Sequence, residues 1–320
     1  MNTSQACSRY YTFFACGDAV GKATEFMTPQ DIRSVFGSIS SMPDISLSIT
    51  HADLPRYAVT DDTEQNLWLL RRYLKDREVS IENTVDELLK WIDGTGAVDK
   101  HYIGPSSLKA LQGIRIGEDP LKAGINGTTC GGIMRVPAAV FASRLLNLDM
   151  DTCIYNALVC THNNSIALES AYAYAYALSY ALDNPGCSDR ELLEKAKQGC
   201  KAGMAKAPWI SAGATLLDRL GFLENQNLSK WNEEDFKSFV YGVLGTGLPS
   251  YETASAVFAL LLYTQDPVRT MFLSAELGGD TDTIGALACS LSAIRNADAE
   301  LPEDIVKPVL EYNRIMEYLG

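Results

Sequence analysis

The sequence lacks the features of membrane, secreted and nucleic-acid-binding proteins. Its most apolar stretch, residues 254–263, covers ten residues, half of the ~20 that a membrane-spanning helix requires. Residues 1–11 are polar and contain no apolar signal-peptide core. Basic residues are scarce, with 27 Lys and Arg against 40 Asp and Glu, and the resulting net charge of −13 repels phosphate backbones. We therefore expect a cytoplasmic monomer that binds neither membranes nor nucleic acid.

Paired cysteines and interdomain linkers are also missing. The eight cysteines are scattered without a C-x-x-C pair, which argues against a zinc ribbon or a disulfide scaffold and indicates buried thiols. No linker rich in Pro, Gly and Ser divides the chain, and no repeat with a period of roughly 20–50 residues is present. The content of 47% hydrophobic and 21% charged residues is typical of a globular protein. The length of 320 residues allows two domains, but we favour one.

Helical patterns dominate the chain. Residues 63–74 follow polar capping residues and carry leucines on one face. Residues 166–182 are rich in Ala and Leu, and three of their tyrosines recur every four residues, which indicates a helix packed in the core. Further helices are predicted over residues 84–92, 190–204, 233–244, 252–262, 267–276, 283–294 and 304–318. One short strand is predicted around Val59, and the chain as a whole is predicted to form an all-α domain over residues 1–320.

Three patterns suggest cofactor sites but have the wrong spacing. Residues 17–22 read GDAVGK, with three residues between the glycines where a P-loop needs four, and Ala follows the lysine. Residues 242–247 read GVLGTG, which has the wrong glycine order for a dinucleotide site and no strand before it. His51, His101 and His162 share no metal-ligand spacing, so we interpret each as a surface or core residue.

Two short acidic segments each precede a helical pattern. Residues 60–63 read TDDT and residues 278–283 read GGDTDT. Helix N-termini attract carboxylates, but one Asp or Thr suffices as a cap, and each segment carries two carboxylates besides hydroxyls. If the segments meet, four carboxylates share one site and repel one another, and a hard cation such as Mg²⁺ or Mn²⁺, rather than Zn²⁺, would relieve the repulsion. The spacing alone leaves a two-metal site and two unrelated caps equally open.

Five motifs, in order along nearly the whole chain, resemble those of the ADP-ribosylglycohydrolase family. This group includes the dinitrogenase reductase-activating glycohydrolase and the ADP-ribosyl-acceptor hydrolases. Residues 17–26 resemble its opening GDAxGxxxEF, and residues 60–63 resemble its TDDT. Residues 131–137 resemble its glycine-rich loop ending in Met-Arg, and residues 161–162 its Thr-His pair. Residues 278–283 resemble its GGDTDT, which is the most specific of the five.

The resemblance implies an all-helical fold with a central cleft that holds two Mg²⁺ (or Mn²⁺) ions. The metal ligands that it implies are Thr60, Asp61, Asp62, Asp280, Asp282 and Thr283. The catalytic residues that it implies are Glu25 and Asp62. The residues that it implies for substrate binding are Gly131, Gly132, Ile133 and Met134, whose backbone N–H groups would meet a pyrophosphate, together with His162.

The activity that the resemblance implies is hydrolysis of the N- or O-glycosidic bond between ADP-ribose and an acceptor side chain, which reverses mono-ADP-ribosylation. The expected partner is the ADP-ribose moiety of a modified protein or small molecule. We expect an arginine acceptor because the opening motif resembles the bacterial arginine-specific branch and because an acidic chain favours a leaving group that becomes cationic. The alternatives are a catalytically weak relative that binds ADP-ribose and a hydrolase of a small ADP-ribosylated molecule.

One segment departs from the family pattern. The family often has an Asp before the Ile-Gly pair that stands here at residues 103–104, but this chain has Tyr102 there, and Asp99 lies three residues earlier. A guanidinium acceptor would then depend on Asp99, or the acceptor site would be more open than in arginine-specific relatives.

Overall fold

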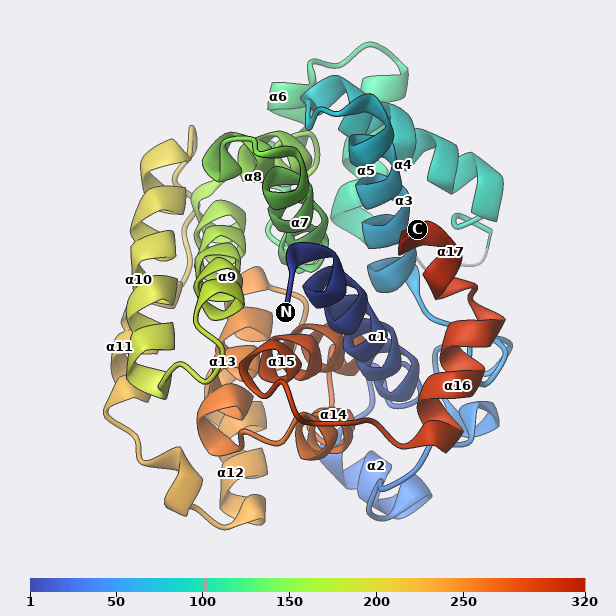
Figure 1. Ribbon diagram of the computed structural model, residues 1–320, viewed down its shortest axis with the longest axis vertical. Coiled ribbons are helices and arrows are strands. Elements are labelled where there is room, and N and C mark those ends of the chain that lie inside the picture. Colours follow the sequence, from blue (N-terminus) through green and yellow to red (C-terminus); the bar gives the residue numbers. More distant parts are fainter. Residues whose placement is uncertain (100–102, 320) are drawn as a thin grey trace.

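The framework of the protein is built from α-helices, which a computed structural model describes over residues 1–99 and 103–319 (Figure 1). The first eight helices are α1 Thr3–Gly21, α2 Pro29–Phe36, α3 Asp61–Asp76, α4 Ile81–Thr95, α5 Pro105–Arg115, α6 Pro120–Ala123, α7 Val136–Leu146 and α8 Met150–Leu158. The others are α9 Ser165–Asp183, α10 Asp189–Lys206, α11 Leu216–Glu224, α12 Glu233–Phe239, α13 Ser250–Tyr263, α14 Pro267–Ala275, α15 Thr281–Arg295, α16 Glu303–Tyr312 and α17 Ile315–Leu319. The described residues contain no strand, which confirms the all-α prediction.

All nine predicted helical segments are helical, with two corrections. The segment predicted as one helix over residues 304–318 is divided into α16 and α17, because Arg314 between them has a left-handed φ of 53°. The segment over residues 233–244 begins as α12 and ends as the π-helix η5 Val240–Leu244. The strand predicted around Val59 is wrong. Val59 lies in an irregular segment before α3, where its N–H donates to Asn313 Oδ1 at 3.1 Å instead of to a neighbouring strand.

Helices α1 and α15 cross at the centre of the molecule with their backbones in close contact (Figure 1). A Cβ atom on Gly17 would lie 2.4 Å from the Gly285 carbonyl oxygen, and one on Gly21 would lie 2.3 Å from the Thr281 carbonyl oxygen. Glycine is therefore required at both positions. The GDAVGK segment ends a helix and forms no phosphate-binding loop, and its glycines bring the start of α15 against the last turn of α1.

The tyrosines of α9 confirm the prediction that this helix packs in the core. Tyr172 and Tyr174 are fully buried. Tyr174 was outside the predicted stripe, yet its hydroxyl donates to the Leu287 carbonyl at 2.8 Å and lies 2.7 Å from the Tyr10 hydroxyl. These bonds satisfy the buried phenols and tie α9 to both α15 and α1.

The helices share one continuous hydrophobic core, which supports the single-domain prediction. All eight cysteines are buried free thiols, as predicted. Among the described residues, no helix combines the length and the apolar character that crossing a membrane demands.

Candidate metal centre and active site

The two acidic segments meet at the adjoining N-termini of α3 and α15. Thr283 Oγ1 lies 3.4 Å from Asp62 Oδ2 and 3.1 Å from Asp280 Oδ1, although Thr283 and Asp62 are 221 residues apart in the sequence. The segments therefore share one cavity of about 140 Å³. Its lining includes the predicted residues Glu25, Asp61, Asp62, Gly131, Met134, Asp280, Asp282 and Thr283.

A double-glycine turn aims the second segment into the cavity. Gly278 and Gly279 both have a φ of 76°, a left-handed conformation that glycine adopts without strain. The Gly279 N–H donates to the Met27 carbonyl at 3.0 Å, and the Phe26 N–H donates back to the Gly279 carbonyl at 2.7 Å. This pair of hydrogen bonds fixes the turn beside the segment that carries Glu25.

The carboxylates at these helix starts are not used up as caps. Asp280 is at the N-cap position of α15 but makes no side-chain capping bond; instead its two oxygens accept from Thr283 and Thr253, each at 3.1 Å. The cap of α3 is Thr60, whose Oγ1 accepts the Asp62 N–H at 3.4 Å. Asp62 Oδ1 is buried and has no hydrogen-bond partner among the described residues. An orphaned buried carboxylate oxygen is costly unless a cation faces it.

Asp18 is a site residue to which the sequence reasoning gave no role. It is fully buried in α1 and accepts the Thr60 N–H at 3.0 Å, the Thr63 N–H at 3.2 Å and the Thr63 hydroxyl at 2.5 Å. These bonds hold the start of α3 against α1 and thereby orient the carboxylates of Asp61 and Asp62. The sequence feature that could have identified Asp18 is its position directly after Gly17, in the motif that packs α1 on α15.

Burial and mutual repulsion make the carboxylates of the cavity hard to ionise. Burial, and then the charge of Asp282, raises the pKa values of Glu25, Asp61 and Asp62 well above their ordinary values. The same two causes raise the pKa of Asp280 to about 8. Burial and the charge of Asp18 raise the pKa of Asp282 to about 6. A bound divalent cation would favour the ionised forms of all these groups.

Lys22 lies behind the carboxylates as a buried cation. Burial lowers its pKa to about 8, and the charges of Asp18 and Asp282 act in the opposite direction. Its ammonium donates to the carbonyls of Arg56 at 2.8 Å and Ala58 at 2.5 Å. Lys22 therefore fastens the loop before α3 to the end of α1.

His51, interpreted from the sequence as a surface or core residue, is buried beside the carboxylates. His51 lines the cavity, and its Nε2 is hydrogen bonded to Glu25 Oε2. One potential ligand atom each from Glu25, His51 and Asp282 lie within 4.8 Å of one another. Burial lowers the pKa of His51. His101 lies outside the described residues.

The glycine-rich loop forms another part of the cavity wall, with His162 packed against it. Gly131 and Met134 line the cavity, and Ile133 is fully buried. A Cβ atom on Gly131 would lie 2.9 Å from His162 Cε1, and one on Gly132 would lie 3.2 Å from His162 Cβ. The His162 ring is itself held by Thr129 Oγ1, 3.0 Å from Nε2, and by Thr161 Oγ1, 2.8 Å from Nδ1. In this structure His162 is fully buried and supports the loop from below.

The departure from the family pattern is only partly described by the structure. Tyr102 lies outside the described residues. Ile103 and Gly104 line the cavity, whereas the Asp99 side chain is exposed and is not among the residues that line it.

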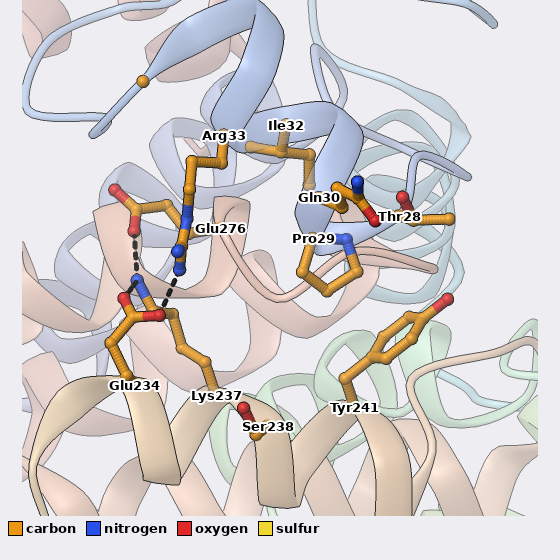
Figure 2. A pocket seen from close by; sticks show the side chains of 11 residues that line it. Thr28, Pro29, Gln30, Ile32, Arg33, Glu234, Lys237, Ser238, Tyr241 and Glu276 are labelled. Atoms are coloured by element: carbon orange, nitrogen blue, oxygen red, sulfur yellow. Dashed lines mark hydrogen bonds and ion pairs between the residues drawn. The ribbon is translucent and has the colours of Figure 1, made fainter.

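A second, larger hollow of about 480 Å³ lies between α2 and α12 (Figure 2). We call it the α2–α12 groove; its lining residues are Thr28, Pro29, Gln30, Ile32, Arg33, Gly37, Glu234, Lys237, Ser238, Tyr241 and Glu276. Figure 2 shows Arg33 paired with Glu234, and Lys237 between Glu234 and Glu276 at 3.1 and 2.9 Å. None of these residues lines the carboxylate cavity.

The motifs that build the cavity belong to a known family. The sequence model of the ADP-ribosylglycohydrolase family matches residues 14–320. The uncharacterized protein YegU of Escherichia coli (strain K12) is 30% identical over 284 residues, which cover 87% of this chain and 83% of YegU. ADP-ribosylhydrolase ARH3 of Homo sapiens is 25% identical over 324 residues, covering 90% of this chain and 84% of ARH3.

A solved structure supports the fold independently. The structure described as "ADP-ribosylglycohydrolase-related protein complex" aligns with a TM-score of 0.60 over 98% of both chains, at 21% identity. At that identity the likeness concerns the architecture alone. Because the family match extends over nearly the whole chain and over both acidic segments, the chain belongs to the ADP-ribosylglycohydrolase family.

Proposed function

We propose that the protein is a metal-dependent hydrolase that cleaves the glycosidic bond between ADP-ribose and an acceptor side chain, and so reverses mono-ADP-ribosylation. The observation that carries this proposal is the convergence of both acidic segments on one cavity, where Asp62 Oδ1 is buried without a partner. Family membership supplies the substrate class, and the printed name of the ARH3 relative agrees with it.

The donor set fits two hard divalent cations, which we propose to be Mg²⁺ or Mn²⁺. Carboxylate and hydroxyl oxygens are the ligands that these ions prefer. The proposed ligands are Thr60, Asp61, Asp62, Asp280, Asp282 and Thr283. When bound, the ions would hold the ribose hydroxyls and make the nearby water more acidic.

Glu25 is the proposed general base. It lines the same cavity, and a bound cation would keep its carboxylate ionised and able to accept a proton. It would take a proton from the water that attacks C1 of the ribose, or orient that water, as an oxocarbenium-like transition state forms. Asp62 is proposed to take part in catalysis by holding the cation that its orphaned oxygen would face.

The size of the cavity favours a division of the substrate between two regions. Its volume of about 140 Å³ is below the ~300–1,000 Å³ of pockets that enclose drug-sized ligands. We place the reacting ribose in it and the pyrophosphate along the wall at Gly131. The Met134 N–H already donates to the Cys130 carbonyl at 3.0 Å, so the proposed pyrophosphate donors are the N–H groups of Gly131, Gly132 and Ile133. Binding the remote pyrophosphate would position the ribose for reaction.

The acceptor is proposed to be arginine. The chain offers a strongly negative field, which favours a guanidine that gains a proton as it leaves. The exposed position of Asp99 gives this proposal no direct guanidinium contact, so it depends on the opening motif and on the field. Side-by-side hydrolysis of an arginine-linked and a serine-linked ADP-ribosyl peptide tests it; faster release from serine contradicts it.

The activity itself is tested on a panel of ADP-ribosylated arginine and serine peptides and small ADP-ribosylated molecules, with Mg²⁺ supplied and withheld. We expect release of ADP-ribose that stops with a chelator and returns with Mg²⁺ or Mn²⁺. Full activity after rigorous metal removal contradicts the metal-dependent mechanism. Binding of ADP-ribose without turnover of any substrate would identify a catalytically weak relative, and turnover of the small molecules alone would identify the other alternative.

A further inference from the structure

The loop over residues 48–58 holds a histidine rigidly inside the carboxylate cavity. The Ser48 hydroxyl accepts the His51 N–H at 3.1 Å, and the His51 carbonyl accepts the Leu54 N–H at 3.0 Å. Farther along the loop, the Lys22 ammonium binds two of its carbonyls. Backbone and side-chain bonds at both ends therefore fix the position of the imidazole, which is 7% exposed.

The same loop grips the segment that carries Glu25. The Thr50 hydroxyl donates to the Glu25 carbonyl at 3.1 Å, and the His51 imidazole binds the Glu25 carboxylate through Nε2. The residue after Glu25, Phe26, has a left-handed φ of 61°, which is unusual for an aromatic residue and shows that the backbone here is held by its surroundings. Both the backbone and the side chain of Glu25 are thus tied to residues 50–51.

The Glu25 carboxylate lies close to other carboxylates that repel it, so it needs a hydrogen-bond donor to hold its orientation. Glu25 faces the charge of Asp282, which repels it, and the Asp282 ligand atom belongs to the same group of three within 4.8 Å. A neutral imidazole donates through one ring nitrogen, so an Nε2–H bond to Oε2 occupies one Glu25 oxygen and leaves the other for a water. A hydrogen bond from a partner that orients a functional group in this way usually changes activity by about 10–100-fold.

We propose that His51 is the positioning residue of Glu25, donating Nε2–H to the Glu25 carboxylate so that this carboxylate faces the reacting water. The proposal rests on the proposed hydrolase function, because the rate that it affects is that of the Glu25-dependent step. The competing role is a nitrogen ligand to a bound metal ion, which imidazole also fills.

Kinetics of the Mg²⁺-loaded enzyme separate these roles. We expect His51→Ala to lower kcat about 10–100-fold with KM changed less than about 3-fold, and His51→Gln, which keeps an N–H donor, to recover most of the loss. In the Glu25→Gln background, His51→Ala should cost little more, because the two residues act through one group. Ala52→Ser, an exposed change on the same loop that alters no charge, is the control for loop disruption and should behave as wild type.

Two results would overturn the proposal. An undiminished effect of His51→Ala in the Glu25→Gln background would show that the residues act independently. A fall in Mg²⁺ affinity as large as that of Asp282→Ala, measured by calorimetry, would make His51 a metal ligand.

A measurement without substrate keeps this test apart from that of the function. In ¹⁵N-labelled, Mg²⁺-loaded protein we expect a slowly exchanging, downfield Nε2-bound proton of His51 that disappears in Glu25→Ala. Its absence from the wild type, or its persistence in Glu25→Ala, refutes the hydrogen bond. If wild type hydrolyses none of the panel, the proposed function fails, and this proton signal still decides whether His51 holds Glu25.

Discussion

Two hollows of this protein contain clustered carboxylates, and the hollows differ in how much positive charge faces those carboxylates. In the α2–α12 groove the Glu234 carboxylate is paired with Arg33, and the Glu276 carboxylate lies 2.9 Å from the Lys237 ammonium (Figure 2). In and beside the carboxylate cavity, six carboxylates lie close together; Glu25, Asp61, Asp62, Asp280 and Asp282 line it, and Asp18 is buried next to them. Among the described residues around it, the groups that can carry positive charge near these six include the buried Lys22, His51 and Arg135.

The difference shows which hollow requires a ligand. The paired groove is electrically satisfied by its own side chains, and its exposed ion pairs contribute little to stability. The cavity has more buried negative charge than its cations can offset, which destabilises the folded chain in the absence of metal. A protein retains such an arrangement where a bound cation compensates for it, and this is the physical reason for assigning function to the smaller hollow rather than to the larger one.

The largest effect should follow from removing a carboxylate from the cavity. We expect Asp282→Ala to reduce hydrolysis below detection and to weaken Mg²⁺ binding by more than the ~10–100-fold that is typical of residues outside the ligand set. The fold should persist, because the burial of the Asp282 carboxylate does not stabilise the fold. Its removal also reduces the repulsion among the remaining carboxylates. Calorimetry with Mg²⁺ and a thermal melt of the same metal-free sample measure both effects.

The matched control is Glu234→Ala in the groove. It removes a carboxylate of the same charge from the other hollow, and we expect Mg²⁺ affinity and turnover to equal those of wild type. An active Asp282→Ala enzyme would refute the ligand assignment, and an inactive Glu234→Ala enzyme would refute the separation of the two hollows.

The next largest effect should come from Glu25→Gln. Glutamine keeps the shape of the side chain but cannot accept a proton, so turnover should fall by roughly 10²–10⁴. ADP-ribose affinity should change by no more than a few-fold, since the proposed pyrophosphate contacts are made by the glycine-rich loop and not by Glu25. Single-turnover kinetics beside ADP-ribose calorimetry make the comparison; unchanged turnover would assign Glu25 a supporting role.

The sequence was sufficient for nine helical segments and for the two acidic segments, but their meeting was expected only from the family resemblance. The TDDT and GGDTDT segments are local patterns, and the positive-φ turn at Gly278 and Gly279 depends on local glycines as well. His51 could not be found in this way, because its partners Glu25 and Asp282 are 26 and 231 residues away in the chain. Isolated histidines carry no spacing signal, and the tertiary bonds of the loop over residues 48–58 to Lys22 and to Glu25 place His51 beside them.

The first helix is an element that was not predicted from the sequence. α1 Thr3–Gly21 was missed because its first residues are polar and the whole of its later part is buried, so that no amphipathic period marks it. The short segment around Val59 is the reverse case, because a strand was predicted there and none forms. Its single buried valine packs through tertiary contacts, and the Asn313 side chain replaces the strand partner.

The excess of buried carboxylates over cations in the cavity should have a smaller effect on the pH dependence of the stability of the metal-free protein. The folded pKa values of Asp282, about 6, and Asp280, about 8, exceed the ordinary value of 3.8, so the native state binds more protons than the unfolded state between these limits. The free energy of unfolding therefore falls as pH rises through this window, and it is greatest below about pH 4 as far as these groups are concerned. We expect the metal-free melting temperature to drop by several degrees from pH 5 to pH 8.

Saturating Mg²⁺ should flatten this slope, because the ion binds the ionised carboxylates. The Asp280→Asn and Asp282→Asn variants should also show a flatter metal-free profile, since they remove the groups responsible. Lys22 has a lowered pKa of about 8 and contributes with the opposite sign only above that value, outside the window. The pKa values of His51 and His162 are lowered by burial, so these histidines contribute with the opposite sign below 6.5. A metal-free melting temperature that rises from pH 6.5 to pH 8 would contradict the assignment of net repulsion to the cavity.

The smallest effect should come from the groove itself. The Arg33–Glu234 pair is solvent-exposed, with 65% and 59% of the two side chains accessible, so Arg33→Ala should change the free energy of unfolding by no more than about 1 kcal/mol. Salt should reduce even this difference, because exposed charges are screened. Urea unfolding at low and high salt measures it. Pro29 of α2 lies against Gly278, so a displacement of α2 would be transmitted to the turn at Gly278 and Gly279. If Arg33→Ala weakened Mg²⁺ binding as well, the two hollows would be coupled through that contact, and the contrast between a satisfied groove and an unsatisfied cavity would have to be replaced by one linked site.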